Sequence, residues 1–553
     1  SRAVKRRDFL ASAGLPLLGC GQTHDIAGGF TGINLERGHL LQAARVWPTP
    51  ALIRRTDVLI AGGGVAGLAA ARALRLQGVE DFALLELEDE AGGNSRGGLT
   101  GGQACPLGAH YLPLPSDDAP EVQDLLEELG LRQRLAGRWV YDERHLCHSP
   151  QERLFFNGSW QEGLLPVHEV GQDSIAQYRK FATLVAQLRH QARWSIPASN
   201  RPLAPVQQAL SAITFEAYLV QQGFTDGHLR WYLDYCCRDD YGAGLASVSA
   251  WAGIHYFASR HGFAAPGLEA TERDHLLTWP EGNAWLTRRL AAPLGARLHP
   301  GRVVLRVTNL KHAVEIDAFN TATQSIERWH ARRAIIALPI FIAARVLESP
   351  PEWLRGAAAQ IAYAPWLVAN IHIKAALHDR PGAAPAWDNL IHGDRQSAPG
   401  LGYVDASHQH LQSVPGATVL TYYRALGDIT AAVGSPAQAP GVAGRHMLLG
   451  QAWQVWRDAI LAELSGPHPD LVGKVTRIDL TRYGHAMAMP LPKVNGQIGL
   501  WPPSDKRSKL FKSVQIEIRH ERLAFAHSDW AGYSIFEEAF TLGHAAASAG
   551  RLL

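Results

Sequence analysis

The order of apolar and polar positions near residue 60 predicts a strand, a tight turn and a helix in direct succession. Residues 57–61 have the sequence DVLIA, a short apolar run typical of a buried strand. The turn sequence GGGVAG follows at 62–67, and LAAARALRLQG then has the apolar spacing of a helix that ends at glycine. A second apolar run, FALL at 82–85, leads to Glu86. This order predicts a β-α-β unit with a glycine-rich turn.

Further along the chain, the pattern predicts the elements of a second region. Residues 121–130 (EVQDLLEELG) have helical spacing and a glycine stop, and helical spacing also dominates residues 205–260. Residues 366–374 (WLVANIHIK) indicate a strand, whereas Gly- and Pro-rich stretches near 380–400 and 432–445 indicate loops. The chain has 553 residues, a length typical of a large two-domain enzyme.

Composition restricts the partners of the protein. Hydrophobic residues make up 46% and charged residues 19% of the chain, as in a globular protein with ample core. The net charge of +2 gives no reason to expect nucleic acid or an anionic membrane surface as a partner. The five cysteines show neither a CxxC pair nor metal-ligand spacing, so no metal site is predicted.

The first 25 residues resemble an export signal. RRDFL at 6–10 is similar to the twin-arginine motif, and LLGC at 17–20 is similar to a lipobox. The resemblance implies export by a twin-arginine-type route to the periplasm. It also makes Cys20 a candidate for lipid attachment and membrane tethering.

The glycine-rich turn has the chemistry of a dinucleotide site. Gly62 permits the tight turn, Gly64 lets the backbone approach a pyrophosphate, and Gly67 allows close packing of helix on strand. The N–H groups at the start of the helix favour phosphate. An acid at the end of the second strand is placed to accept hydrogen bonds from ribose hydroxyls. The predicted cofactor residues here are Gly62, Gly64, Val65, Ala66, Gly67 and Glu86.

The segment after Glu86 resembles the flavin-containing amine oxidase family and its relatives, the phytoene desaturases and protoporphyrinogen oxidases. Gly92 and Gly93 stand where the family has a Gly-Gly pair. Asn94 replaces the arginine that usually follows, and Arg96 is the nearest cation. Residues 108–111 (GAHY) are similar to the family segment near the flavin ring, which implies a flavin-site role for His110.

Later segments resemble the same family in order and spacing. PEG at 280–282 and AIIALP at 334–339 are similar to family motifs, and Val304 lies on the strand whose backbone meets the adenine. Asp529 matches the acid at the ribityl or pyrophosphate end, and a helix from about Ile535 would point its N-terminus at the flavin. EEAFTLG at 537–543 matches the family's last motif only in part. The resemblance implies FAD. No cysteine stands in a motif that would demand a covalent bond, so we expect the FAD to be held non-covalently.

The resemblance implies an α/β fold, α+β overall, with a Rossmann-like FAD-binding domain that is discontinuous in sequence. This domain would take residues 51–115, 270–345 and 505–553, after a signal at 1–25. Residues 116–269 and 346–504 would form a substrate domain of mixed sheet and helices. Because the twin-arginine route carries folded proteins, it suits an enzyme that takes up FAD in the cytoplasm.

The resemblance implies an exported FAD-dependent oxidoreductase of the amine oxidase or dehydrogenase type. Hydride would pass from the C–H next to an amine nitrogen to flavin N5, with polyamines among the candidate substrates. His110, Tyr483 and His485 are the candidate catalytic residues. Many amine oxidases have a lysine near the flavin, but no lysine stands at 368–370, which favours a quinone or other carrier over O2 as electron acceptor.

Two other hypotheses stay open at this point. The first is a FAD-dependent desaturase or dehydrogenase of a hydrophobic substrate, and the second is a non-catalytic FAD protein in an assembly. An amine enzyme would need an acidic approach to the flavin, whereas a desaturase would need an apolar one.

Overall fold

The predicted strand, turn and helix form β2 (Leu52–Ala61) and α2 (Val65–Leu76), and β3 (Phe82–Leu85) follows them. The computed structural model describes residues 25–42, 46–147, 151–267, 275–410, 414–431, 436, 438–493 and 518–548. The proposed signal, Cys20 included, and residues 505–517 and 549–553 lie outside these described residues.

The first large sheet is built around β2 and has the strand order β12-β3-β2-β15-β14-β13, with β22 beside β15. β12 (Leu298–His299), β3, β2, β15 (Ser325–Ile336) and β22 (Leu523–Phe525) run parallel. β13 (Arg302–Asn309) and β14 (Val314–Asn320) extend the sheet in antiparallel fashion, and β21 (Ile518–His520) pairs with β22. Strands from three distant parts of the chain therefore meet in one dinucleotide-binding sheet.

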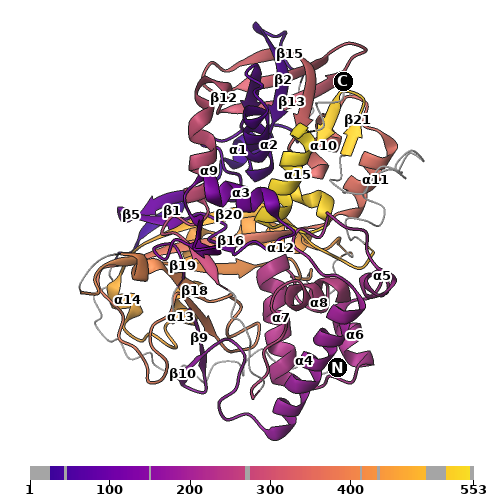
Figure 1. Ribbon diagram of the computed structural model, residues 1–553. Coiled ribbons are helices and arrows are strands. Elements are labelled where there is room, and N and C mark those ends of the chain that lie inside the picture. Colours follow the sequence, from indigo (N-terminus) through magenta and orange to yellow (C-terminus); the bar gives the residue numbers. More distant parts are fainter. Residues whose placement is uncertain are drawn as a thin grey trace, which may run out of the picture.

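The second large sheet has the order β1-β20-β16-β19-β18-β17-β9-β10 (Figure 1). Its centre is formed by β16 (Tyr363–Ile373), β19 (Thr418–Ala425) and β20 (Val475–Ala488). β18 (Tyr403–Asp405), β17 (Asp388–Ile391), β9 (Glu152–Phe156) and β10 (Ser159–Glu162) complete one side, and β1 (Ala27–Phe30) closes the other. The predicted strand at 366–374 falls within β16, whereas β17 lies in a stretch expected to be loop. The flanking glycines and prolines hid this short strand.

Helices α4 to α8 form a separate group, at the lower right of Figure 1. They are α4 (Gln172–Gln191), α5 (Pro205–Ser211), α6 (Phe215–Gln221), α7 (Gly227–Tyr241) and α8 (Ala250–Ala258). Their buried side chains share one hydrophobic core with residues of the second sheet, such as Trp366, Leu390 and Tyr423. Helix α7 ends at Gly242, which has φ +75° and lies against β16.

The remaining elements connect these layers or cover them. Three strand pairs are β4 (Gly97–Thr100) with β5 (Gln103–Pro106), β6 (Tyr111–Pro113) with β11 (Leu276–Thr278), and β7 (Arg132–Leu135) with β8 (Arg138–Tyr141). The helices are α1 (Leu35–His39), α3 (Pro120–Glu128), α9 (Ala284–Ala291), α10 (Ile340–Val346), α11 (Glu352–Gln360), α12 (Val442–Gly450), α13 (Trp453–Leu464), α14 (Leu471–Lys474) and α15 (Phe536–Ser548). The predicted helix at 121–130 is α3, and the described part of 432–445 includes the start of α12.

The mixed α/β architecture confirms the predicted fold class. No described helix is long and apolar enough to cross a membrane.

The sequence prediction assigns the segment from Ile26 to Leu41 to neither domain. Its strand β1 pairs in parallel with β20, and the Asn34 N–H then donates to Glu88 Oε1 at 3.0 Å. This segment therefore joins the second sheet to the dinucleotide-binding sheet.

Candidate functional site: a dinucleotide turn beside an aromatic and acidic group

The turn between β2 and α2 is closed so tightly that only glycine fits at two of its positions. Gly62 has φ +103°, a region that L-residues rarely adopt. A Cβ at Gly67 would lie 1.9 Å from the Gly62 carbonyl oxygen. Val65 and Ala66 begin α2, and a Cβ at Gly543 would lie 2.1 Å from the Ala66 carbonyl oxygen. Helix α15 is thereby packed directly against the start of α2.

A second glycine pair faces this turn. The Gly92 N–H donates to the Gly63 carbonyl oxygen at 2.8 Å, and a Cβ at Gly93 would lie 3.0 Å from the Gly64 Cα. Two bare stretches of backbone therefore line the start of α2, where N–H groups and the helix dipole favour phosphate. A cradle that any side chain would fill fits the pyrophosphate of a dinucleotide.

Glu86 ends β3 with its carboxylate buried beside the turn. Oε2 accepts from the Gly63 N–H and Oε1 from the Glu88 N–H, both at 2.8 Å. Burial raises the pKa of this carboxyl, and the two N–H donors oppose that change. The Arg302 N–H donates to the Glu86 carbonyl oxygen at 2.7 Å, which sets β13 and its buried Val304 beside the acid. The predicted ribose and adenine contacts thus lie together.

Asn94 and Arg96, which follow the glycine pair, both form hydrogen bonds with other parts of the protein. The Asn94 side chain donates to the Ala486 carbonyl oxygen at 2.6 Å. Arg96 is buried, donates to the carbonyl oxygens of Gly93 and Gly32, and lies 3.6 Å from Glu88. Arg96 therefore faces the N-terminal segment in this structure, and a contact of Asn94 or Arg96 with the cofactor stays a prediction.

Asp529 lies at the other end of the predicted site, buried before α15. It accepts hydrogen bonds from the Ile340 N–H at 3.0 Å and the Tyr363 hydroxyl at 2.6 Å, and His527 Nδ1 is 3.0 Å away. Burial would raise the pKa of Asp529, but these partners outweigh it and hold the pKa below its usual value. Ile535 directly precedes α15, as predicted, and the Ala539 N–H donates to its carbonyl oxygen.

The mismatch in the last family motif has a structural role. The Glu538 carboxylate accepts hydrogen bonds from the Ser199 side chain and from the Tyr533 hydroxyl, the latter at 2.7 Å. It also accepts from the Ala198 N–H. Glu538 thus binds α15 to residues 198–199 of the helical region.

His110 is the centre of an aromatic group at the second sheet. Its ring stacks on Tyr423 with centroids 4.4 Å apart and lies 5.0 Å from Tyr111 and 5.4 Å from Trp387. Burial lowers the pKa of His110 to about 3, so its imidazole is neutral at physiological pH. The Tyr423 hydroxyl donates to the Gly108 carbonyl oxygen at 2.9 Å.

The three candidate catalytic residues do not form one constellation. Tyr483 is close to His110, since a Cβ at Gly108 would lie 3.0 Å from the Tyr483 hydroxyl. That buried hydroxyl has no hydrogen-bond partner among the described residues, and burial raises its pKa to about 12. His485 instead stacks on Phe341 at 4.5 Å and lies 5.7 Å from Tyr363, which binds Asp529. His485 thus belongs to the Asp529 end.

A group of carboxylates beside these aromatic residues was missed by sequence reasoning. Asp239 and Asp240 come from α7 and Asp388 from β17, and all three charges act on the Tyr111 hydroxyl. Asp240 pairs with Arg260 at 3.0 Å. Asp239 has no hydrogen bond or ion pair within the described part of the chain. Burial and then the Asp240 charge raise its pKa to about 7.

Asp388 is held in the same electrostatic field. Burial and the charges of Asp239 and Glu152 raise its pKa well above the usual value, while a hydrogen bond from Tyr235 opposes that rise. Glu537, in the first turn of α15, also has a pKa raised to about 7 by burial. Arg260 is a cation in this field, but it already pairs with Asp240. The region therefore holds more carboxyl groups than cations, and their raised pKa values show that ionisation of all of them is unfavourable without a further positive charge.

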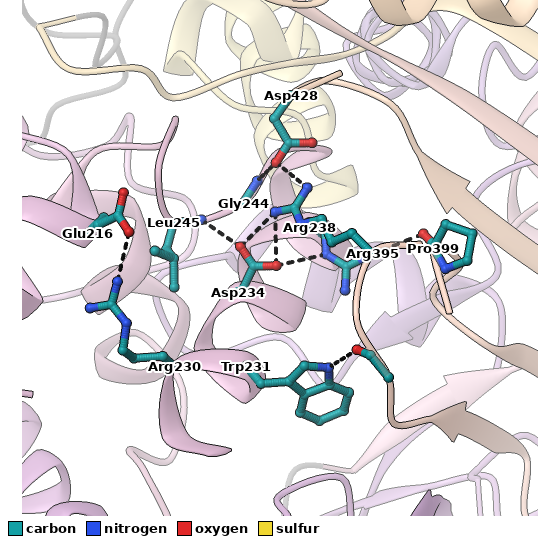
Figure 2. Close-up of polar contacts among 11 residues, drawn as sticks. Glu216, Arg230, Trp231, Asp234, Arg238, Gly244, Leu245, Arg395, Pro399 and Asp428 are labelled. Atoms are coloured by element: carbon teal, nitrogen blue, oxygen red, sulfur yellow. Dashed lines mark hydrogen bonds and ion pairs between the residues drawn. The ribbon is translucent and has the colours of Figure 1, made fainter. Parts of the chain in front are cut away.

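An ion-pair network fixes the helix that carries Asp239 (Figure 2). Arg395 lies between Asp234 of α7 and Asp428, at 2.8 and 2.6 Å, and Asp234 also pairs with Arg238 at 3.1 Å. The Gly244 N–H donates to Asp428 and the Leu245 N–H to Asp234. The Trp231 indole donates to the Gly393 carbonyl oxygen. The network joins α7, the turn after it and the loops of the second sheet that carry Gly393, Arg395 and Asp428.

The paired glycine turns, the acid after β3 and the separate aromatic region define a FAD-dependent oxidoreductase. The chain belongs to the flavin-containing amine oxidoreductase family, whose model matches residues 65–424. This membership confirms the resemblance drawn from the motifs and establishes FAD as the cofactor. A search of curated protein sequences finds no match.

Solved structures of the same fold cover nearly the whole chain. Putrescine oxidase bound to putrescine has 17% identity and a TM-score of 0.63, over 91% of this chain and 100% of that one. Cyclohexylamine oxidase from Brevibacterium oxydans IH-35A has 16% identity and a TM-score of 0.61, over 89% and 98%. A CLA-producing fatty acid isomerase from P. acnes has 15% identity and a TM-score of 0.57, over 90% and 99%. At these identities the likeness establishes the fold.

Proposed function

We propose that this protein is a FAD-dependent amine oxidase or dehydrogenase whose substrate is a primary or secondary amine. When bound, FAD supplies a two-electron acceptor at N5. A hydride would leave the carbon next to nitrogen, which oxidises the amine to an iminium ion. Water then hydrolyses that ion to a carbonyl compound and releases ammonia from a primary amine or a smaller amine from a secondary one. O2, a quinone or another carrier takes the two electrons.

The excess of carboxylates beside His110 carries this proposal. A buried carboxylate without a cation is costly, and its pKa rises accordingly. Asp239 has that raised pKa and no hydrogen bond or ion pair among the described residues, and the charges of Arg260 and Arg238 lower its pKa only in part. Asp388 lies in the same group, and its pKa is also raised. An ammonium group placed between them would supply the missing positive charge. Substrates with more than one ammonium group, such as polyamines, suit the several carboxylates best.

The aromatic group provides the second requirement of amine oxidation, a neutral nitrogen at the reacting carbon. Tyr111, Tyr423 and Trp387 surround the neutral His110 and leave it little water. Desolvation lowers the pKa of an ammonium group, so an amine that enters this region from the carboxylates loses its proton more easily. Recognition by charge and reaction as the free base are thereby separated in space.

The same charges argue against a purely hydrophobic substrate. An apolar molecule beside Asp239 and Asp388 would displace water from both carboxylates without compensating either charge. These carboxyl groups therefore disfavour the desaturase hypothesis, although one structural neighbour is a fatty acid isomerase. A non-catalytic FAD protein would bind no amine, so that hypothesis leaves the group of carboxylates unexplained.

Localisation and flavin attachment extend the proposal. The RRDFL and LLGC segments support export of the folded, FAD-loaded protein to the periplasm, with Cys20 as a candidate lipid site. Substitution of both Arg6 and Arg7 by lysine should leave the protein in the cytoplasm.

The described cysteines are buried thiols, which supports non-covalent FAD, and acid precipitation should release the flavin into solution.

Anaerobic mixing of the purified yellow protein with monoamines, diamines and polyamines tests the proposal. Bleaching of the flavin absorbance by an amine is the expected result. Bleaching by dithionite but by no amine would overturn it. Air admitted after bleaching then separates the acceptors, because rapid return of the yellow colour identifies O2, whereas slow return identifies a quinone or another carrier.

A further inference from the structure

The β7–β8 hairpin, which the proposed reaction does not use, presents apolar side chains to solvent. Leu135, Trp139 and Val140 are 50, 45 and 36% exposed. Arg134 lies opposite Trp139 and Leu135 opposite Arg138, so each face of the hairpin has an apolar residue beside an arginine. Single exposed apolar residues are ordinary, but three on a ten-residue hairpin are not.

The turn of this hairpin has a small apolar residue where a polar one is usual. Ala136 and Gly137 form its two central residues with φ of +47° and +81°. Two-residue turns of this kind favour Asn-Gly or Asp-Gly, because Asn and Asp tolerate positive φ and their polar side chains suit water. Alanine has neither advantage. The tip Leu135-Ala136-Gly137 therefore accepts a strained alanine in place of a polar residue.

The charges on the hairpin are all positive. Residues 132–141 contain Arg132, Arg134 and Arg138 and no acid. Arg132 pairs with Glu127 at 2.6 Å and lies over the Trp139 ring at 3.7 Å. Arg134 and Arg138 have no ion pair within the described ranges. The whole chain has a net charge of only +2, so attraction to an anionic surface would come from local groups of basic residues such as this one and not from the chain as a whole.

We propose that the β7–β8 hairpin inserts its tip into the interface of an anionic phospholipid bilayer. Leu135, Val140 and the Trp139 ring would enter the boundary between headgroups and acyl chains, where an amphipathic indole is well placed. Arg134 and Arg138 have long stems and would reach back to lipid phosphates. The inference is independent of the proposed reaction.

Vesicle flotation of the full chain tests this inference. All variants carry Cys20→Ser, so that no acyl chain contributes to binding. The protein should float with vesicles of phosphatidylcholine mixed with phosphatidylglycerol, and the L135S/W139S variant should bind at least about tenfold less. Val220→Ser is the matched control, because Val220 is 64% exposed on α6, and its binding should equal that of the parent.

The R134Q/R138Q variant tests the electrostatic part. It should bind phosphatidylcholine vesicles as the parent does and lose most of the gain from phosphatidylglycerol, a gain that salt should also weaken. Flavin content and unfolding temperature identify any variant that fails to fold. Equal flotation of the parent and the L135S/W139S variant, or none by the parent, overturns the inference. A parent that does not float but forms a dimer lost in L135S/W139S also overturns it and assigns the hairpin to a second copy.

Discussion

The dinucleotide turn and the carboxylates of α7 lie in the same molecule but are held by opposite kinds of interaction. At the turn, positions are fixed by the absence of side chains, since Gly62, Gly64 and Gly67 let backbone meet backbone. At α7, positions are fixed by side chains, since Arg395 and Asp428 hold the helix from another region. The first site resists any added atom, whereas the second depends on charges that exchange protons near neutral pH.

The largest expected effect is at the turn. Gly67→Ala would place a Cβ 1.9 Å from the Gly62 carbonyl oxygen, and only movement of the backbone relieves this contact. We expect loss of bound FAD and destabilisation by about 3 kcal/mol or more, as for severe overpacking. Flavin absorbance per protein and thermal unfolding measure the two effects.

The matched control is Gly227→Ala, in the first turn of α7, where an added Cβ meets nothing within 4 Å. This variant should keep its flavin, because alanine suits a helix as well as or better than glycine. If Gly67→Ala also retains a full complement of FAD, the close packing of α2 on the turn is not what shapes the cofactor site.

The dinucleotide turn could be predicted from the sequence, whereas the group of carboxylates could not. The glycine motif is contiguous and therefore visible in the sequence, although Gly62 and Gly64 also lie against distant backbone at Ala337 and Gly93. The carboxylates come from α7 and β17, about 150 residues apart, and nothing links them before the chain folds. The DD pair at 239–240, among buried cysteines and tyrosines, was the one available signal. The roles of Arg96 and His485 could not be predicted because distant backbone sets their partners.

The second effect concerns substrate recognition. The D239N/D388N variant keeps the volume of both side chains and removes both charges. Losing charge-assisted contacts to an ammonium group should weaken amine binding about 100-fold, at about 1.5 kcal/mol for each contact. The amine dependence of anaerobic flavin reduction gives the dissociation constant and, separately, the limiting rate, which should change much less.

Glu216→Gln is the control for this experiment, since Glu216 pairs with Arg230 at 2.7 Å on the same helical region but outside the group. Its dissociation constant should match that of the parent. An unchanged constant in D239N/D388N would mean that amines approach the flavin by another side, while the family assignment itself would stand.

The pH dependence of binding is the third test. With a pKa of about 7 in the free protein, Asp239 is mostly protonated at pH 6 and mostly ionised at pH 8. Amine binding should therefore tighten as pH rises, by about tenfold over this interval. In Asp239→Asn the same curve should be flat. A dependence that persists in this variant would assign the ionisation to another group, such as Glu537.

The same ionisation should appear in stability with the opposite trend. A folded-state pKa of about 7, above the ordinary aspartate pKa of 3.8, means that the folded protein binds the proton more tightly than the unfolded chain. The contribution of Asp239 to stability is present below pH 3.8 and is lost as pH rises to about 7. Asp239→Asn should accordingly stabilise the substrate-free protein by about 1–3 kcal/mol at pH 8 and hardly at pH 4. Thermal unfolding at both pH values measures this difference.

The smallest effect is expected in the ion-pair network that holds α7 in place. Arg395→Gln removes the cation between Asp234 and Asp428 but touches neither flavin nor substrate. Arg395 is half-exposed, so solvent screens both contacts and the shift of α7 should cost about 1 kcal/mol, equivalent to about fivefold in amine affinity. The limiting reduction rate should stay unchanged, and Arg395→Lys, which keeps the charge, should recover part of the affinity. Arg230→Gln, which removes a cation from α7 itself, should have no effect on amine binding. If Arg395→Gln lowers the unfolding temperature but leaves affinity intact, the network stabilises α7 without positioning its carboxylates.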